Sequence, residues 1–343
     1  MALTARGRTA ALLLSCTLAG LCPAARLMAQ EPQPRRVGVF LWHDSANDLA
    51  TLEGIRTGLA SSGLQVEYVQ GHAGSDPQRG RDELRRIRAA GVELVFALGT
   101  QAVQLAAAEV KDLPVVYGAV SNPVVSGIVP DWKGSGTNVA GASNWIPPAT
   151  VLGAFQLAVP GLRKLGMLRT SKSGTVSDAE ARTMREHLAT LAGPRVELVE
   201  QSATDAAGIG AAVEALVAAG VQAVWVPIDI TIYDNMPAVQ AALGSRGVPL
   251  VTTAMKAARE GAAVGVVVDY QLLGRRTAAL ALQVLRKERD PGSIPVDTMR
   301  GYQVVVNPEA ARRQGYELPL PLLIVADQLV ATPAPAPVPR KDN

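Results

Sequence analysis

The same β-α pattern occurs twice in this chain, and the second copy begins roughly 130 residues after the first. Each matching string contains a short apolar run that is typical of a buried strand. Some of the strings also include the few residues before that run. In order, the matched pairs are Arg35–Phe40 with Arg163–Leu168, Ala89–Phe96 with Ala218–Trp225, and Leu113–Val116 with Val248–Val251. Three ordered matches at a nearly constant offset indicate two similarly built lobes. The alternative is chance similarity among strands rich in Ala and Val.

Short apolar runs alternate with helical patterns along the first copy. Strands are predicted over residues 37–42, 64–69, 92–98 and 114–120, with helices over 49–61, 78–90 and 101–110. Short connections between alternating strands and helices are typical of a mostly parallel sheet that is covered on both faces. The predicted fold class is therefore α/β, with two doubly wound parallel-sheet lobes joined by a hinge.

The last part of the chain holds more elements than a second lobe needs to repeat the first. A strand is predicted over 262–268, a long helix over 271–287, a strand over 302–306 and a short helix over 308–314. We therefore expect the chain to return to the first lobe. The predicted organisation is a first lobe of residues 30–144 and 270–297, a second lobe of 145–269 and 298–330, and a disordered Pro/Ala tail over 331–343.

Residues 1–29 have the pattern of a secretory signal peptide. Arg6 and Arg8 precede an apolar run over 9–21 that is too short to span a bilayer, and residues 27–29 form an acceptable cleavage site. The alternative is a buried N-terminal helix. Both cysteines lie in this leader, so we expect no thiol in the mature chain. The protein is predicted to be exported to the periplasm, and a lipoprotein anchored through Cys16 ranks second.

Composition and charge exclude two broad classes of protein. Hydrophobic residues make up 48% and charged residues 18% of the 343, which rules out a globally disordered chain. The formal net charge of +3 equals the three arginines of the leader, which no acid accompanies, so the rest of the chain is neutral. Aromatic residues are only 4%. We therefore expect no nucleic acid as a partner.

No motif for a cofactor, a metal or covalent catalysis occurs in the sequence. Gly208-x-Gly210 lacks the third glycine and the preceding strand of a dinucleotide site, and no Walker or Gly-x-Ser-x-Gly pattern is present. The three histidines, at 43, 72 and 187, have no partner at metal-ligand spacing. We therefore expect no cofactor, no metal and no catalysis. The rival hypothesis is a cleft enzyme without a recognisable motif.

Polar residues directly follow several of the predicted strands. Ligands of open parallel sheets bind beyond the carboxyl ends of the strands, and two facing lobes form a cleft that closes on a hinge. The hydroxyls and amides found there suit a small polar or zwitterionic molecule. The alternative for each Ser, Thr, Asn and Asp is a cap on the next helix. The predicted ligand-binding residues are Trp42, Thr100, Gln101, Ser121, Asn122, Asn144, Ser171, Ser173, Asp229, Thr253 and Asp269.

Asp229 and Trp42 are the predicted anchors from opposite lobes. Asp229 follows the buried run 224–228, and a charge held in a closing cleft needs a partner, which a ligand ammonium or surrounding hydroxyls supply. Trp42 ends the first strand, where its ring can cover an apolar face of the ligand. The alternatives are an N-cap for a helix over 231–243 and a half-buried core ring.

Six short stretches between residues 114 and 311 carry a resemblance to a known family. They are Pro114–Val124, Asn138–Ser143, Val226–Asp229, Asp269–Arg275, Ile294–Val296 and Val306–Ala311. In this order and spacing the chain resembles the periplasmic substrate-binding proteins of ABC transporters, in the group whose characterised members bind tryptophan or tyrosine. The resemblance extends from about residue 36 to 321, which is nearly the whole mature chain.

The resemblance implies a type I periplasmic-binding fold with three crossing strands, and an ABC transporter membrane permease as the partner. We expect the protein to be a monomer. It places the helix from Gln271 in the first lobe, and the last strand and helix in the second. Asn122 stands where the family usually has Asp, and Thr253-Ala254 replace a common Gly-Asp. The loss of an acid near the pocket argues against an α-amino group as the anchor of the ligand. A ligand sensor for a receptor kinase would use the same cleft and is the alternative to transport.

Overall fold

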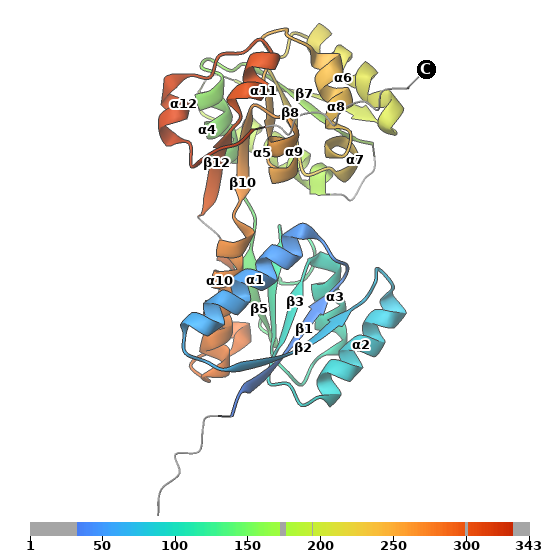
Figure 1. The fold of residues 1–343 in the computed structure, drawn as a ribbon, viewed down its shortest axis with the longest axis vertical. Coiled ribbons are helices and arrows are strands. Elements are labelled where there is room, and N and C mark those ends of the chain that lie inside the picture. The colour runs from blue at the N-terminus through green and yellow to red at the C-terminus, as the bar shows by residue number, and fades with distance from the viewer. Residues whose placement is uncertain (1–32, 172–175, 194, 299–300, 332–343) are drawn as a thin grey trace, which may run out of the picture. The chain divides into compact units, whose positions relative to one another are not determined.

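The computed structural model describes residues 33–171, 176–193, 195–298 and 301–331. In this part the chain forms two α/β lobes, each a sheet with helices on both faces, as the sequence predicts (Figure 1). The predicted leader, and the predicted tail apart from residue 331, lie outside the described residues. No described helix is long and apolar enough to cross a membrane.

The first sheet has six strands in the order β11-β5-β4-β3-β1-β2, and all of its pairings are parallel. Its helices lie in the connections, because a parallel strand pair needs a crossover long enough to return the chain to the same edge. The strands are β1 (Arg35–Leu41), β2 (Val66–His72), β3 (Val95–Leu98), β4 (Val115–Val120), β5 (Val139–Ser143) and β11 (Asp297–Thr298). The helices are α1 (Ala46–Ser61), α2 (Pro77–Ala89), α3 (Thr100–Glu109) and α10 (Tyr270–Leu285), with a 3-10 turn over Pro291–Ser293.

Alternation along β1 divides the first lobe into two core layers. Val39 and Leu41 pack with α1 and α10, whereas Phe40 packs on the opposite face with α2 and α3. Figure 1 shows α1 and α10 side by side over the sheet. They approach so closely that a Cβ on Gly54 or Gly274 would overlap backbone atoms of the other helix. The late helix α10 is therefore an integral part of the first lobe.

The second sheet has seven strands in the order β13-β12-β10-β9-β8-β6-β7, and only β10 and β12 run antiparallel. Its core has two layers, one on the α4 and α5 face and one on the α6 and α8 face. The strands are β6 (Lys164–Thr170), β7 (Glu197–Ala203), β8 (Ala223–Val226), β9 (Leu250–Thr252), β10 (Val264–Val268), β12 (Tyr302–Val306) and β13 (Gln328–Leu329). The helices are α4 (Pro148–Ala158), α5 (Val176–Thr190), α6 (Ile209–Ala218), α7 (Ile230–Tyr233), α8 (Met236–Leu243), α9 (Met255–Glu260), α11 (Pro308–Arg313) and α12 (Leu320–Val325), with a 3-10 turn over Ala206–Gly208.

The helix predicted over 231–243 is wrong, because the structure divides this segment into α7 and α8. Pro237 lies in the first turn of α8 and has no N–H to donate to the carbonyl of Tyr233. Nδ2 of Asn235 instead donates to the carbonyl oxygen of Thr231 at 2.8 Å. The proline therefore starts a new helix and ends the first one after a single turn.

Candidate ligand-binding site

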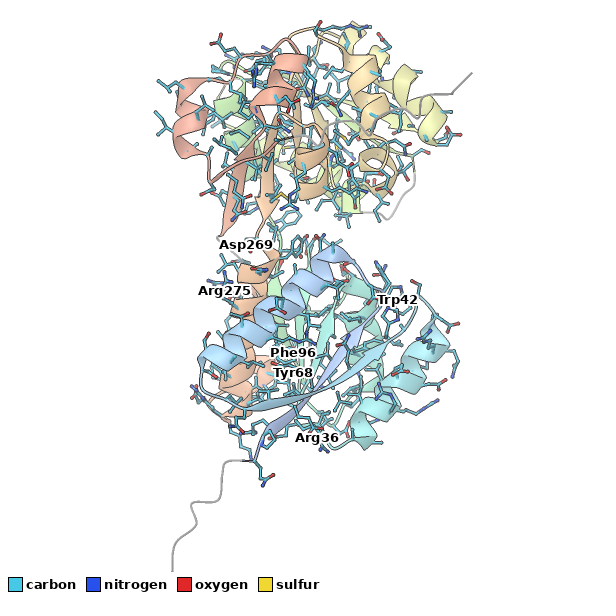
Figure 2. The ribbon with its side chains drawn as sticks, viewed as in Figure 1. Arg36, Trp42, Tyr68, Phe96, Asp269 and Arg275 are labelled. Carbon is cyan, nitrogen blue, oxygen red and sulfur yellow. The ribbon has the colours of Figure 1, made fainter. Side chains whose placement is uncertain are left out.

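The carboxyl ends of the two sheets lie where the chain passes between the lobes. β5 ends at Ser143 and α4 begins at Pro148, while Asp269 alone separates β10 from α10. A residue spans at most about 3.5 Å, so these short connections hold the ends of β5 and β10 near the opposite lobe. Figure 2 shows Trp42 and Asp269 at this end of the first lobe and Arg36 at the other. Ligands of open α/β sheets bind at the carboxyl ends of strands, which makes this the candidate site.

A hydrogen-bonded group at the first-lobe end joins Ser121 and Asn144 to Tyr270. Nδ2 of Asn144 donates to Oγ of Ser121 at 3.2 Å and to the Tyr270 hydroxyl at 3.3 Å. Asn144 is only 6% exposed, and its Oδ1 has no hydrogen-bond partner among the described residues. Buried polar atoms are nearly always paired, so this oxygen is an acceptor available to a ligand. Two predicted site residues are thus brought together here.

Asp48 is an acid of this edge that the sequence analysis missed. It lies in the first turn of α1, is 5% exposed and faces Gly99, whose φ of 87° lets the chain turn beside the carboxylate. Burial raises the pKa of Asp48, while a hydrogen bond from Ser45 and the charge of His43 lower it. An acid at the third position of a helix after a Ser cap gave no signal of burial, because such acids usually stabilise the helix from its surface.

The other predicted residues of the first lobe have mainly local roles in the structure. Trp42 is half-buried against the core layer that α2 and α3 cover. Oδ1 of Asn122 accepts from the N–H of Val125 at 3.1 Å, and Oδ1 of Asp269 accepts from the N–H of Leu272 at 2.9 Å. Asp269 therefore caps α10, as the capping alternative anticipated. Thr100 and Gln101 form the first turn of α3 at the same edge.

Asp229 lies at the carboxyl end of β8 in the second lobe and is 6% exposed. Its Oδ2 accepts three hydrogen bonds, from the N–H and the hydroxyl of Thr170 at 2.8 and 2.9 Å and from the hydroxyl of Ser177 at 3.0 Å. Its Oδ1 accepts from the N–H of Ile232 at 3.4 Å, which caps α7. Four protein donors therefore satisfy this carboxylate, and the surrounding hydroxyls supply the partner that the sequence analysis required.

Glu180, on α5, is the second carboxylate at this end and was also missed. Its Oε2 accepts from the N–H of Ile228 and its Oε1 from the hydroxyl of Thr253, each at 2.8 Å. Burial raises its pKa to about 7, and the nearby charge of Asp229 adds to the increase, although the two hydrogen bonds oppose it. The buried positions of α5 are Ser177, Ala181 and Met184. Residue 180 shares their face at a spacing of three and four, which is the signal that helical periodicity could have provided.

Ser171 and Ser173 are the remaining predicted residues of the second lobe. Ser171 is exposed just after β6, and its N–H donates to the carbonyl of Ala203. Ser173 lies outside the described residues.

Two tyrosines lie within electrostatic reach of these acids. Burial is the main cause of the raised pKa of Tyr270, and the negative charges of Asp48 and Glu180 increase it further. Burial, with the charges of Asp234 and Asp229, raises the pKa of Tyr233 to about 12. Carboxylate and amide oxygens therefore dominate this edge, beside two phenol rings. Such a set is suited to a ligand that donates hydrogen bonds. In the described part of the chain, no three His, Cys, Asp or Glu side chains are grouped so that they could hold a metal ion.

Comparison with a protein-family model agrees with this architecture. The model described as ABC transporter substrate binding protein matches residues 36–330. A tyrosine-binding protein of Clostridioides difficile (strain R20291) is 25% identical over 221 residues. That match covers 64% of this chain and 62% of the relative, so it spans less than two thirds of the relative's length.

Two solved structures share the fold. A domain from Streptococcus pneumonia in complex with L-Trp is 26% identical, covers 87% of this chain and 100% of its own, and has a TM-score of 0.69. A ligand-free, open substrate-binding protein with adhesive properties from Clostridium difficile is 22% identical, covers 87% of this chain and 99% of its own, and has a TM-score of 0.77.

Proposed function

Because the chain belongs to the family of ABC transporter substrate-binding proteins, we propose that it captures a small polar molecule between its two lobes and delivers it to a membrane permease. The ligand that we propose is an amino acid or a related compound. The observation that carries the proposal is the group of polar side chains at the carboxyl ends of both sheets, beside the places where the chain passes between the lobes.

Two similar proteins support the proposed ligand class. One is described as tyrosine-binding, and the other was crystallised with L-Trp. The tyrosines at 233 and 270 and the half-buried ring of Trp42 offer aromatic surface at the same edge. Aromatic rings pack well against an aromatic ligand, whereas the acids and amides beside them are suited to its polar end.

We propose that the predicted residues at these strand ends form the ligand-binding site. Some of them contact the ligand, and Asp229 positions the segments around it. Ser121, Asn144 and Thr253 have side chains within the hydrogen-bonded groups of the edge. Asp229 positions the end of β6 and the start of α7, since its carboxylate is already satisfied by protein donors. Catalysis is not part of the proposal.

A thermal-shift screen tests the proposal directly. The exported protein is melted in the presence of amino acids, biogenic amines, sugars and small carboxylates. A ligand that binds only the folded state raises the melting temperature, by an amount that grows with its concentration above Kd. We expect a stabilising solute among the amino acids or their relatives. If no solute of any class shifts the transition, the proposed function is wrong.

Export is the second part of the proposal and has its own test. Residues 1–29 are expected to be removed, so that the mature protein starts near Gln30 and is released into the periplasm. Mass spectrometry of the protein from a periplasmic extract should give a mass that corresponds to cleavage after Ala29. An acylated N-terminal Cys16 would contradict this and identify a lipoprotein.

A further inference from the structure

The two carboxylates at the carboxyl end of the second sheet differ in how many acceptor positions remain free. A carboxylate offers about four positions for hydrogen bonds. Asp229 accepts four bonds from protein groups and is buried. Among the described residues Glu180 accepts two, from Ile228 and Thr253, and its side chain is partly exposed. Glu180 therefore keeps about two acceptor positions that no described residue fills.

No basic residue neutralises Glu180 within the described part of the chain. The ion pairs formed there by other acids of the second lobe involve Asp178, Glu200, Glu214, Asp234 and others, but not Glu180. Its charged neighbours are Asp229, which is also acidic, and the ionisable hydroxyl of Tyr270. A carboxylate that is partly removed from water and unpaired is costly unless it is protonated or meets a cation.

A second, independent feature at the same edge also lacks a partner. Asn144 is 6% exposed and holds the Tyr270 hydroxyl through Nδ2, while its Oδ1 accepts no hydrogen bond from the described residues. Tyr270 is the residue whose hydroxyl is influenced by Asp48 and Tyr233 as well as by Glu180. An unused acceptor therefore lies beside the Tyr270 hydroxyl.

We propose that Glu180 binds an ammonium group of the ligand, with Oδ1 of Asn144 as a further acceptor, so that the protein selects solutes that carry an amine. This inference rests on the proposed function and specifies its substrate class. A primary ammonium has three N–H donors and a positive charge. The donors match the unfilled acceptor positions of Glu180 and Oδ1 of Asn144, and the charge matches the carboxylate of Glu180, which has no basic partner.

Proton release is a consequence that can be measured. The unliganded carboxyl of Glu180 is partly protonated near neutral pH, because burial and Asp229 raise its pKa to about 7. An ammonium at hydrogen-bonding distance favours the ionised form and lowers this pKa, so the proton leaves as the amine binds. The other groups that face Glu180 are Asp229, Tyr270, and the hydrogen-bond donors of Ile228 and Thr253. Affinity for an amine is therefore expected to increase as the pH rises through 7.

The experiment compares three probes that share an indole ring. L-Tryptophan carries an amine and a carboxylate, tryptamine only the amine, and indole-3-propionate only the carboxylate. Calorimetry is carried out on the parent protein, on Glu180→Gln and on Glu186→Gln, an exposed residue of the same helix. We expect the two amines to bind the parent at least tenfold more tightly than indole-3-propionate. Glu180→Gln should weaken the amines by about tenfold to a hundredfold and leave indole-3-propionate unchanged. Glu186→Gln should behave like the parent.

The outcomes separate this inference from the proposed function. If indole-3-propionate binds the parent as tightly as the amines, or if only amine-free solutes stabilise it in the thermal screen, the protein is still a binding protein but the inference is overturned. If no solute of any class binds, the proposed function fails and the inference with it.

Two further measurements test the inference even if Glu180→Gln does not fold. Glu180→Asp keeps the charge and should retain the preference for amines at reduced affinity. For the parent protein, calorimetry at pH 6 in two buffers of different ionisation enthalpy should show release of up to one proton on binding of L-tryptophan or tryptamine, and none at pH 9. Tight binding at pH 6 without proton release would overturn the proposal.

Discussion

At the scale of single residues, the number of donors around a carboxylate decides what it can do. Asp229 was the predicted ligand anchor of the second lobe, and the structure surrounds its Oδ2 with donors from Thr170 and Ser177. Those bonds join the end of β6, the start of α5 and the start of α7. The side chain therefore ties three segments together, whereas contact with a ligand stays a prediction.

The Asp229→Asn variant tests which role dominates. Its amide nitrogen would meet the donors of Thr170 or Ser177, so at least one buried bond is lost, at a cost of about 1–3 kcal/mol in unfolding free energy. We expect the affinity for the best ligand of the screen to change less than threefold. Denaturant unfolding and calorimetry measure the two quantities. Asp205→Asn, an exposed cap of a 3-10 turn, is the control for simple loss of a cap. A tenfold loss of affinity with parental stability would restore Asp229 as the anchor.

The carboxyl of Glu180 predicts how stability depends on pH in the absence of ligand. Its pKa is raised from 4.5 to about 7, so the folded protein binds this proton more tightly than the unfolded chain does. The contribution is fully present below pH 4.5 and is lost as the pH rises through 7, by roughly 3 kcal/mol at most. Urea unfolding at pH 5, 6, 7 and 8 should show a decline for the parent and for Glu186→Gln that is reduced in Glu180→Gln. Equal slopes for all three proteins would show that Glu180 titrates normally.

At the scale of elements, the contact between α1 and α10 attaches the late part of the chain to the first lobe. Gly54 and Gly274 face each other across this contact, and a side chain on either would overlap backbone atoms. Close helix contacts of this kind need glycine for its lack of a Cβ, since the φ angles of both residues are ordinary helical ones. The packing of α10 on the first lobe therefore depends on the absence of a side chain at Gly54 and Gly274.

Gly274→Ala is expected to destabilise the protein by about 1–3 kcal/mol or more, because two helix backbones must separate to admit a methyl group. Gly153→Ala is the matched control in the middle of α4, where no atom lies within 4 Å of the added Cβ. The control should gain about 0.5–1 kcal/mol from its better helix propensity. Thermal or urea unfolding gives both values. Similar behaviour of the two variants would contradict close packing of α1 on α10.

At the scale of the whole molecule, the short connections between the lobes favour a hinge. The chain passes between them after β5, between β10 and α10, and between β11 and β12. Changes of φ and ψ at a few element-terminal residues suffice for a domain closure, whereas the packed cores of the lobes resist deformation. We propose that the ligand, which needs acceptors from both lobes, draws them together.

Small-angle scattering with and without a saturating ligand from the screen tests this closure. We expect a smaller radius of gyration with the ligand, because the two lobes approach each other as their contacts to it form. A related solute that does not shift the melting temperature serves as the control for solvent effects. An unchanged radius of gyration at saturation would exclude closure of the lobes, but it would not contradict the proposed binding site.

Local patterns in the sequence are enough to predict the architecture of this protein. Apolar strand runs, helical periodicity and their repetition predicted two doubly wound parallel-sheet lobes, and the structure confirms that fold class. The order of short motifs also identified the family that the comparisons show. These properties are encoded locally, because period and burial pattern depend on residues a few positions apart. The break between α7 and α8 was within reach as well, since Pro237 marks it.

Which acids of the candidate site have all their acceptor positions filled depends on contacts between distant parts of the chain. Three of the four donors of Asp229 come from residues 52 and 59 positions away, and Glu180 is held by residues 48 and 73 positions away. Helical spacing places Glu180 on the buried face of α5, but it does not show which donors the carboxylate meets, and no local pattern distinguishes Asp48 from an ordinary first-turn acid of α1. Their burial, and hence their pKa values and their remaining acceptor positions, depend on which distant strand ends the fold brings beside them.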